Sequence, residues 1–113
     1  MEFSENKMIE LAKSNSKELA RILTNPTTGI FTLIPGLEIL GGEVLDEDVV
    51  LPVFRLLINH RNATVRESVL IGISAFFINK TPPKDILDKL EKMAESDPSP
   101  TIKEITKDYL KNF

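Results

Sequence analysis

Residues 62–67 read Asn62-Ala63-Thr64-Val65-Arg66-Glu67, and this stretch occurs three times in altered form along the chain. The copy 37 residues earlier reads Asn25-Pro26-Thr27-Thr28-Gly29-Ile30, and the copy 37 residues later reads Ser99-Pro100-Thr101-Ile102-Lys103-Glu104. Each copy opens with a good helix N-cap, continues with Pro or Ala at the first helical position, and then has Thr. Helix starts that recur at a fixed spacing are typical of stacked helical arrays. The stretch therefore predicts a helical repeat protein.

The apolar residues between these starts follow helical spacing along most of the chain. Residues 4–23 form the first such segment, with a break expected at Ser14-Asn15-Ser16, where short polar side chains compete for backbone groups. The second helix is expected to start at Asn25-Pro26 and to stop at the pair Gly41-Gly42. The remaining helices are expected at about 47–59 with Asp46 or Asp48 as cap, at 63–78, from Thr81-Pro82 with Thr81 as cap, and after Ser99. The pattern predicts an all-α fold of six helices in three pairs.

The first helix of each predicted pair keeps the same register. At the 37-residue offset, apolar positions coincide in three sets: Leu19, Leu56 and Met93; Ala20, Leu57 and Ala94; and Ala12, Val49 and Ile86. Two independent helices that share one register indicate repetition of a helix pair.

A known family resembles this pattern. His60-Arg61-Asn62-Ala63-Thr64-Val65-Arg66-Glu67-Ser68-Val69 is similar to the turn and second helix of a HEAT repeat, in which a Val-Arg pair follows a short polar turn. Residues 95–104 resemble the same element with Lys103 in place of Arg, and the first copy departs from it with Thr28-Gly29. The resemblance implies an α-α superhelix of about three HEAT-like pairs in a single domain, 1–113, with repeats at about 4–42, 43–79 and 80–113. In this fold we expect Arg66 to pair with a turn acid or a backbone carbonyl of an adjacent repeat.

Composition restricts the classes of function. The net charge is −3, with 14 Lys and Arg against 17 acids, which argues against broad binding to a phosphate backbone. The absence of cysteine fits a reducing compartment and excludes thiol chemistry. Neither a secretory signal nor an apolar run long enough for a membrane span is visible, so we expect a cytoplasmic protein with no membrane partner.

Catalytic chemistry has few candidates in this sequence. His60 is the sole histidine, and its place in a turn without an evident nucleophile favours a surface or capping role. Gly41-Gly42 lacks the following Lys-Ser/Thr of a phosphate-binding loop, and no residues show metal-ligand spacing. We therefore expect no enzyme activity, no cofactor and no metal.

Three surface features are candidates for binding a protein. The second predicted helix is apolar nearly all round at Ile30, Phe31 and Ile34. Either residues 1–13 fold over this face or part of it is a protein-binding or self-association patch, which would make the chain a monomer or a weak homodimer. The acidic connector with Glu43, Asp46 and Glu47 is a solvated loop or a contact for a basic partner. The polar residues Arg61 and Glu67, near the repeat ends, could rim a groove.

The favoured function is a non-catalytic HEAT-type module for protein–protein interaction. Small HEAT-like chains can accompany bacterial toxins, so a specific version is an immunity or antitoxin-like protein that binds and blocks a partner. Two alternatives stay open. The chain could be an accessory or enzyme of the HEAT-like lyase type, or it could bind nucleic acid along a concave basic surface as some HEAT-like proteins do.

Overall fold

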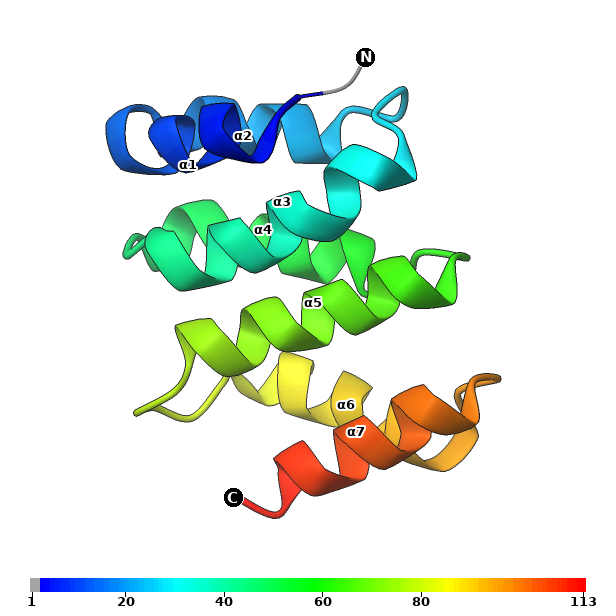
Figure 1. Cartoon of the computed structure of the whole chain (residues 1–113). Coiled ribbons are helices and arrows are strands. Elements are labelled where there is room, and N and C mark those ends of the chain that lie inside the picture. Colours follow the sequence, from blue (N-terminus) through cyan, green and yellow to red (C-terminus); the bar gives the residue numbers. More distant parts are fainter. Residues whose placement is uncertain (1–2) are drawn as a thin grey trace. The chain divides into compact units, whose positions relative to one another are not determined.

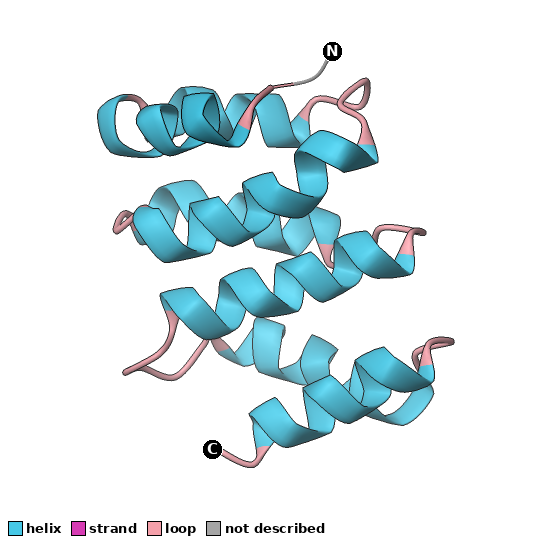
Figure 2. Ribbon diagram, viewed as in Figure 1, coloured by secondary structure: helices cyan, strands magenta, loops and turns pink. Residues whose placement is uncertain are grey.

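The computed structural model describes residues 3–113, and within them it contains helices joined by turns and no strand (Figure 2). The all-α prediction is confirmed at this level, but the described chain has seven helices and not six. The chain divides into two compact units, of which the first ends at Phe76 and the second spans Phe77–Phe113.

The extra helix arises at the expected break near residue 15. α1 (Glu5–Ser14) and α2 (Ser16–Thr24) are separate helices, since Asn15 leaves helical geometry at φ −157° and ψ 71°. The Asn15 backbone N–H donates to the Leu11 carbonyl, and its side-chain Oδ1 accepts from the backbone N–H of Glu18 at 3.3 Å. One residue thus ends α1 and caps α2, so the expected break separates two helices.

α3 (Ile30–Glu43) begins four residues later than the repeat pattern predicts, so the assignment of Asn25 as its cap is wrong. The Asn25 side chain instead closes a turn by accepting from the backbone N–H and hydroxyl of Thr27 at 2.9 and 2.8 Å. Two β-branched threonines and a glycine follow, and all three are weak helix formers. Gly29, extended at φ −78° and ψ 164°, then precedes the helix without a side-chain cap.

α4 (Glu47–Leu57) and α5 (Ala63–Phe76) start where the sequence predicts. The Asp46 carboxylate caps α4 by accepting from the Asp48 N–H at 2.9 Å. Asn62 Oδ1 caps α5 by accepting from the N–H groups of Thr64 and Val65 at 2.9 and 3.2 Å. Both helices end two residues earlier than predicted.

The five helices of the first unit form two layers (Figure 1). α3 packs between α1 and α5 in one layer, and α2 packs on α4 in the other. Fully covered side chains from all five helices fill the space between the layers, including Met8, Leu19, Leu37, Phe54 and Ile73. Leu56, one of the coinciding apolar positions of the sequence, is an exception to this burial, because 54% of it is exposed.

The second unit is a helix pair, α6 (Lys84–Ser96) packed on α7 (Pro100–Leu110). Ser99 caps α7 as predicted, by accepting from the Ile102 N–H at 3.3 Å. The predicted cap of α6 at Thr81 is wrong, because α6 starts only at Lys84. Pro83 keeps the preceding Pro82 out of helical geometry, so the helix cannot begin before the second proline.

Candidate functional site

The outer face of α3 is more apolar than an ordinary solvated helix face. Phe31 is 74% exposed at the first turn, and Ile34 and Pro35 are half-buried on the same side. Glu38 and Gly42 continue this side toward the end of the helix and are exposed. The five residues recur at helical spacing, so they form one continuous stripe.

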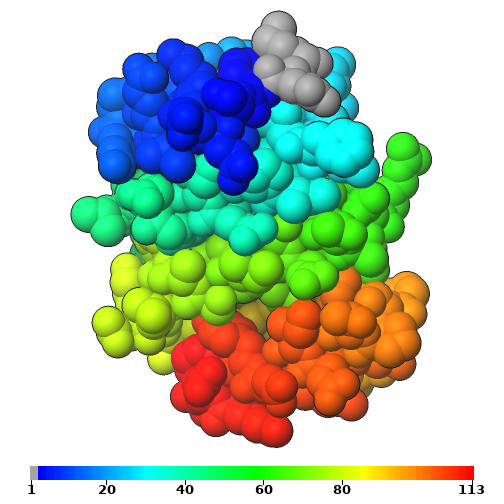
Figure 3. Space-filling view, in the orientation of Figure 1, coloured from blue at the N-terminus to red at the C-terminus, as the bar shows by residue number. Residues whose placement is uncertain are grey.

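A second stripe on α5 lies beside the first. Glu67 is half-buried and Ile71 is 39% exposed, one turn apart on the solvent side of α5. Between the helices, the Ser68 hydroxyl donates to Glu38 Oε2 at 3.5 Å. Figure 3 shows the α3 segment in cyan and the α5 segment in green uncovered on one side of the first unit. We call this surface the α3–α5 face and define it by Phe31, Ile34, Pro35, Glu38, Glu67 and Ile71.

Glycine allows α3 and α5 to approach closely enough to share one surface. A Cβ atom on Gly41 would lie only 2.5 Å from the Cα of Gly72 and closer still to the Gly72 carbonyl oxygen. Gly41-Gly42 therefore does not stop α3, as the sequence suggested, because Gly41 is a packing position inside the helix. Gly42 points to open space, with nothing within 4 Å of its would-be Cβ.

Pro35 adds a backbone acceptor to this face. Proline has no N–H, so Pro35 cannot donate to the carbonyl of Phe31 one helical turn earlier. The Phe31 carbonyl is therefore without its usual helical donor, on the same side of α3 as the exposed Phe31 ring. A partner that carries an N–H donor could satisfy this oxygen.

The charges on the face are acidic. Glu38 and Glu67 are its two ionisable residues. Arg66 is adjacent in sequence, but its Nη1 donates to the backbone carbonyls of His60 and Arg61 at 2.9 and 3.0 Å. Both carbonyls lie in the turn just before α5, whereas the sequence analysis expected a partner in an adjacent repeat.

The structure separates the predicted site residues into two groups. Phe31, Ile34 and Glu67 lie on the α3–α5 face, and Ile30 is half-buried at the start of α3. The other four are exposed and lie away from the face: Glu43 ends α3, Glu47 begins α4, and Asp46 and Arg61 lie in the turns between helices. The sequence analysis missed Pro35, Glu38 and Ile71, although helical spacing from Phe31 would have identified the first two.

α1 covers one flank of α3, which settles part of the question about its apolar surface. Met8 is completely buried, and the Phe3 backbone N–H donates to the buried Thr32 hydroxyl at 3.3 Å. Residues from the 1–13 segment thus cover the side of α3 that carries Thr32 and Gly36. The side that carries Phe31 stays open.

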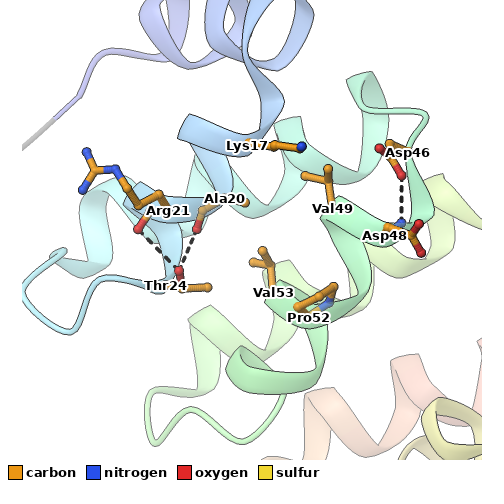
Figure 4. A pocket seen from close by; sticks show the side chains of 9 residues that line it. All are labelled: Lys17, Ala20, Arg21, Thr24, Asp46, Asp48, Val49, Pro52 and Val53. Atoms are coloured by element: carbon orange, nitrogen blue, oxygen red, sulfur yellow. Dashed lines mark hydrogen bonds between the residues drawn. The ribbon is translucent and has the colours of Figure 1, made fainter.

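A groove of about 400 Å³ between α2 and α4 is a second candidate (Figure 4). Lys17 and Arg21 line one wall, Asp46 and Asp48 line the other, and Val49 and its apolar neighbours lie between them. Arg21 Nε and Nη2 donate to the two Glu18 carboxylate oxygens at 2.6 Å, which lowers the pKa of Glu18. Arg21 is therefore already paired on α2, which leaves Lys17 opposite Asp46 and Asp48 in the groove.

His60 is the one histidine of the sequence and lies in the turn before α5. His60 Nδ1 accepts the Asn62 backbone N–H at 3.0 Å, so the histidine caps its own turn. No group of three or more potential metal-ligating side chains occurs in residues 3–113. Across the same residues, no helix combines the length and apolar character needed to cross a bilayer.

Comparison with known proteins does not assign a family. No protein-family model matches the chain, and searches of curated proteins and of solved structures gave no significant match. The composition and geometry of the α3–α5 face are therefore the basis for assigning a function.

Proposed function

We propose that this chain is a non-catalytic protein-interaction module of the HEAT type, which binds and blocks a partner protein through the α3–α5 face. The spacing of helix starts supports the repeat assignment. α4 and α6 start at Glu47 and Lys84, and α5 and α7 start at Ala63 and Pro100, so both pairs are offset by 37 residues. The pair α2–α3 would be the first, divergent repeat, with α1 packed against its outer side.

The observation that carries the proposal is the exposure of Phe31 within an apolar stripe. The Phe31 side chain is 74% exposed and lies beside half-buried Ile34 and Pro35. Contact between this apolar surface and water is unfavourable, and a partner that covers it would remove the contact. Binding hot spots are commonly aromatic or large apolar groups at the centre of a patch with a polar rim. Phe31 and Ile71 would be the anchors, and Glu38 and Glu67 the rim.

The alternative functions have weaker support. A nucleic-acid surface needs Lys and Arg to neutralise phosphates, whereas the ionisable residues of the α3–α5 face are glutamates. A lyase-type activity would need a pocket with reactive groups, and the α2–α4 groove offers surface charges over an apolar floor. An immunity or antitoxin-like role is the specific version that we favour, in the cytoplasm of a bacterial cell.

Affinity purification from the cells that produce the protein tests the proposal. Wild type is compared with Phe31→Asp, and Leu45→Asp is the matched control. Leu45 is 91% exposed in the α3–α4 connector, so its change has the same chemistry outside the face. Circular dichroism first confirms that both variants fold.

We expect one partner in near-stoichiometric yield with wild type and with Leu45→Asp, and its loss with Phe31→Asp. A partner that Phe31→Asp retains would remove the α3–α5 face from the binding site. Loss with both variants would point to the connector or to a nonspecific effect of added charge, and would also contradict the proposed site.

A further inference from the structure

The charges of the α3–α5 face restrict the chemistry of what it binds. We infer that its occupant is a cationic segment of a partner protein, with Lys or Arg side chains flanking one or two large apolar side chains. This inference rests on the proposed function, because it takes the α3–α5 face as the docking surface.

The region that supplies α3 is acidic over a long stretch. Between Arg21 and Arg55 the sequence contains five acids and no Lys or Arg. Glu38 is on the α3–α5 face, and the other four acids are in or next to the connector that follows α3: Glu43, Asp46, Glu47 and Asp48. A cationic ligand that approaches α3 would meet one sign of charge along the helix and beyond its end.

The two glutamates of the face have acceptor capacity left for such a ligand. Glu38 Oε2 receives a long hydrogen bond from the Ser68 hydroxyl, at 3.5 Å, and a carboxylate can accept about four hydrogen bonds. Within residues 3–113, no ion pair joins Glu38 or Glu67 to a Lys or Arg side chain. Both carboxylates can therefore accept from a partner's ammonium or guanidinium group.

The apolar part of the face requires more than a simple polycation. The ring of Phe31 and the side chain of Ile71 are exposed and would be covered best by large apolar side chains. The Phe31 carbonyl, without a donor from Pro35, could accept from an N–H beside such an anchor. The combination fits an amphipathic cationic segment.

Two other occupants fit the charges poorly. A second copy docked face to face would bring its own Glu38 and Glu67 toward the same carboxylates, and opposed like charges disfavour association. An anionic lipid surface would be repelled for the same reason. The acidic rim thus favours a different, basic protein.

Nuclear magnetic resonance titration with two synthetic peptides tests this inference. The probe is a helical peptide with Leu and Trp on one side and Lys on its flanks, and the matched control peptide has Glu in place of Lys. We expect the cationic peptide to shift backbone amide resonances of α3 and α5, and the acidic peptide to leave them unchanged.

Charge-neutral variants of the protein provide the second measurement. Glu38→Gln/Glu67→Gln should weaken binding of the cationic peptide about tenfold and reduce its dependence on salt concentration. Glu91→Gln/Glu95→Gln removes the same charge from exposed positions of α6, which is not part of the face, and should change binding by less than about threefold.

Several results would overturn the inference. These are equal binding of the acidic peptide, absence of shifts on α3 and α5 with the cationic peptide, or no effect of Glu38→Gln/Glu67→Gln. If a cellular partner is lost with Phe31→Asp but retained at equal affinity by Glu38→Gln/Glu67→Gln, the proposed function stands and the cationic partner does not. If Phe31→Asp retains the partner, the docking face itself is wrong.

Discussion

Gly41 of α3 and Gly72 of α5 are in backbone contact, and neither position has room for a side chain. A Cβ on Gly41 would be 2.5 Å from the Gly72 Cα, and a Cβ on Gly72 would be 2.7 Å from the Leu37 carbonyl oxygen. Real Cβ atoms do not occur at such distances, so any side chain here must push the helices apart. The glycine pair therefore sets the spacing of α3 and α5, and with it the shape of the α3–α5 face.

Gly41→Ala should destabilise the protein by about 2–3 kcal/mol, because the obstructing atoms are backbone and cannot rotate away. Its neighbour provides the control, since nothing lies within 4 Å of a Cβ on Gly42. Gly42→Ala should be neutral or stabilising by about 0.5 kcal/mol, through better helix propensity. Urea unfolding monitored by circular dichroism compares the two. Equal midpoints would contradict the close approach.

Met8→Ala tests whether α1 is an integral part of the first unit. Met8 is fully buried, and its sulfur is 3.1 Å from the place of a Cβ on Gly36 of α3. Truncation to alanine should lower the free energy of unfolding by about 2–4 kcal/mol, because apolar burial is lost and a cavity is left behind. The exposed neighbour Lys7 provides a control, and Lys7→Ala should stay within about 0.5 kcal/mol. A thermal melt with similar midpoints for both variants would mean that α1 is loosely attached.

Asn62→Ala tests the cap of α5, the helix that carries one side of the α3–α5 face. The Asn62 side chain accepts from two backbone N–H groups, so its loss should cost about 1 kcal/mol. Asn62→Asp keeps an acceptor at the helix N-terminus and should retain most of the stability. Chemical denaturation of the three proteins measures the difference. If Asn62→Asp and Asn62→Ala lowered the free energy of unfolding equally, the loss of stability would not be due to the missing cap.

The helical class was predictable because most helix starts and apolar stripes are local signals. Three helices have the caps that the sequence assigned to them: Asn62, Ser99 and Asp46. A short polar side chain just before an apolar run is well placed to accept from the first free N–H groups of a helix. Asn25 shows the limit of this signal. The same residue type followed by Thr27-Thr28-Gly29 closes a turn, because weak helix formers leave the competing geometry more stable.

Gly41 shows why the site was harder to predict than the fold. A glycine pair near the end of an apolar run resembles a helix stop, and only the position of α5 reveals that Gly41 is a contact point. The surface beside it combines residues about 30 positions apart, such as Glu38 and Ser68. Long-range pairing of this kind cannot be seen in a single sequence. The sequence therefore identified Phe31 and Ile34 on α3 and Glu67 on α5, but missed Ile71 and Glu38 beside them.

Tyr109 of α7 carries a buried hydroxyl that has no hydrogen-bond partner within residues 3–113. Its ring packs edge-on against Phe113, with the ring centres 5.3 Å apart. Tyr109→Phe keeps this ring contact and removes the unsatisfied hydroxyl. The variant should therefore be as stable as wild type near neutral pH, or more stable by up to about 1 kcal/mol. A clear loss of stability in urea unfolding would mean that the hydroxyl does have a partner.

The same residue gives the protein a specific response to alkaline pH. Burial raises the pKa of the Tyr109 hydroxyl above its usual value near 10. Below pH 10 the group is neutral in both folded and unfolded chains; as the pH rises further, the unfolded chain ionises first and folding stability is lost. Tyr109→Phe lacks the hydroxyl that ionises. Its free energy of unfolding should therefore fall less than that of wild type between about pH 8 and pH 11. Because the chain has one Tyr and no Trp, tyrosinate absorbance follows this group alone. An ionisation midpoint at or below 10 in the folded protein would refute the assignment.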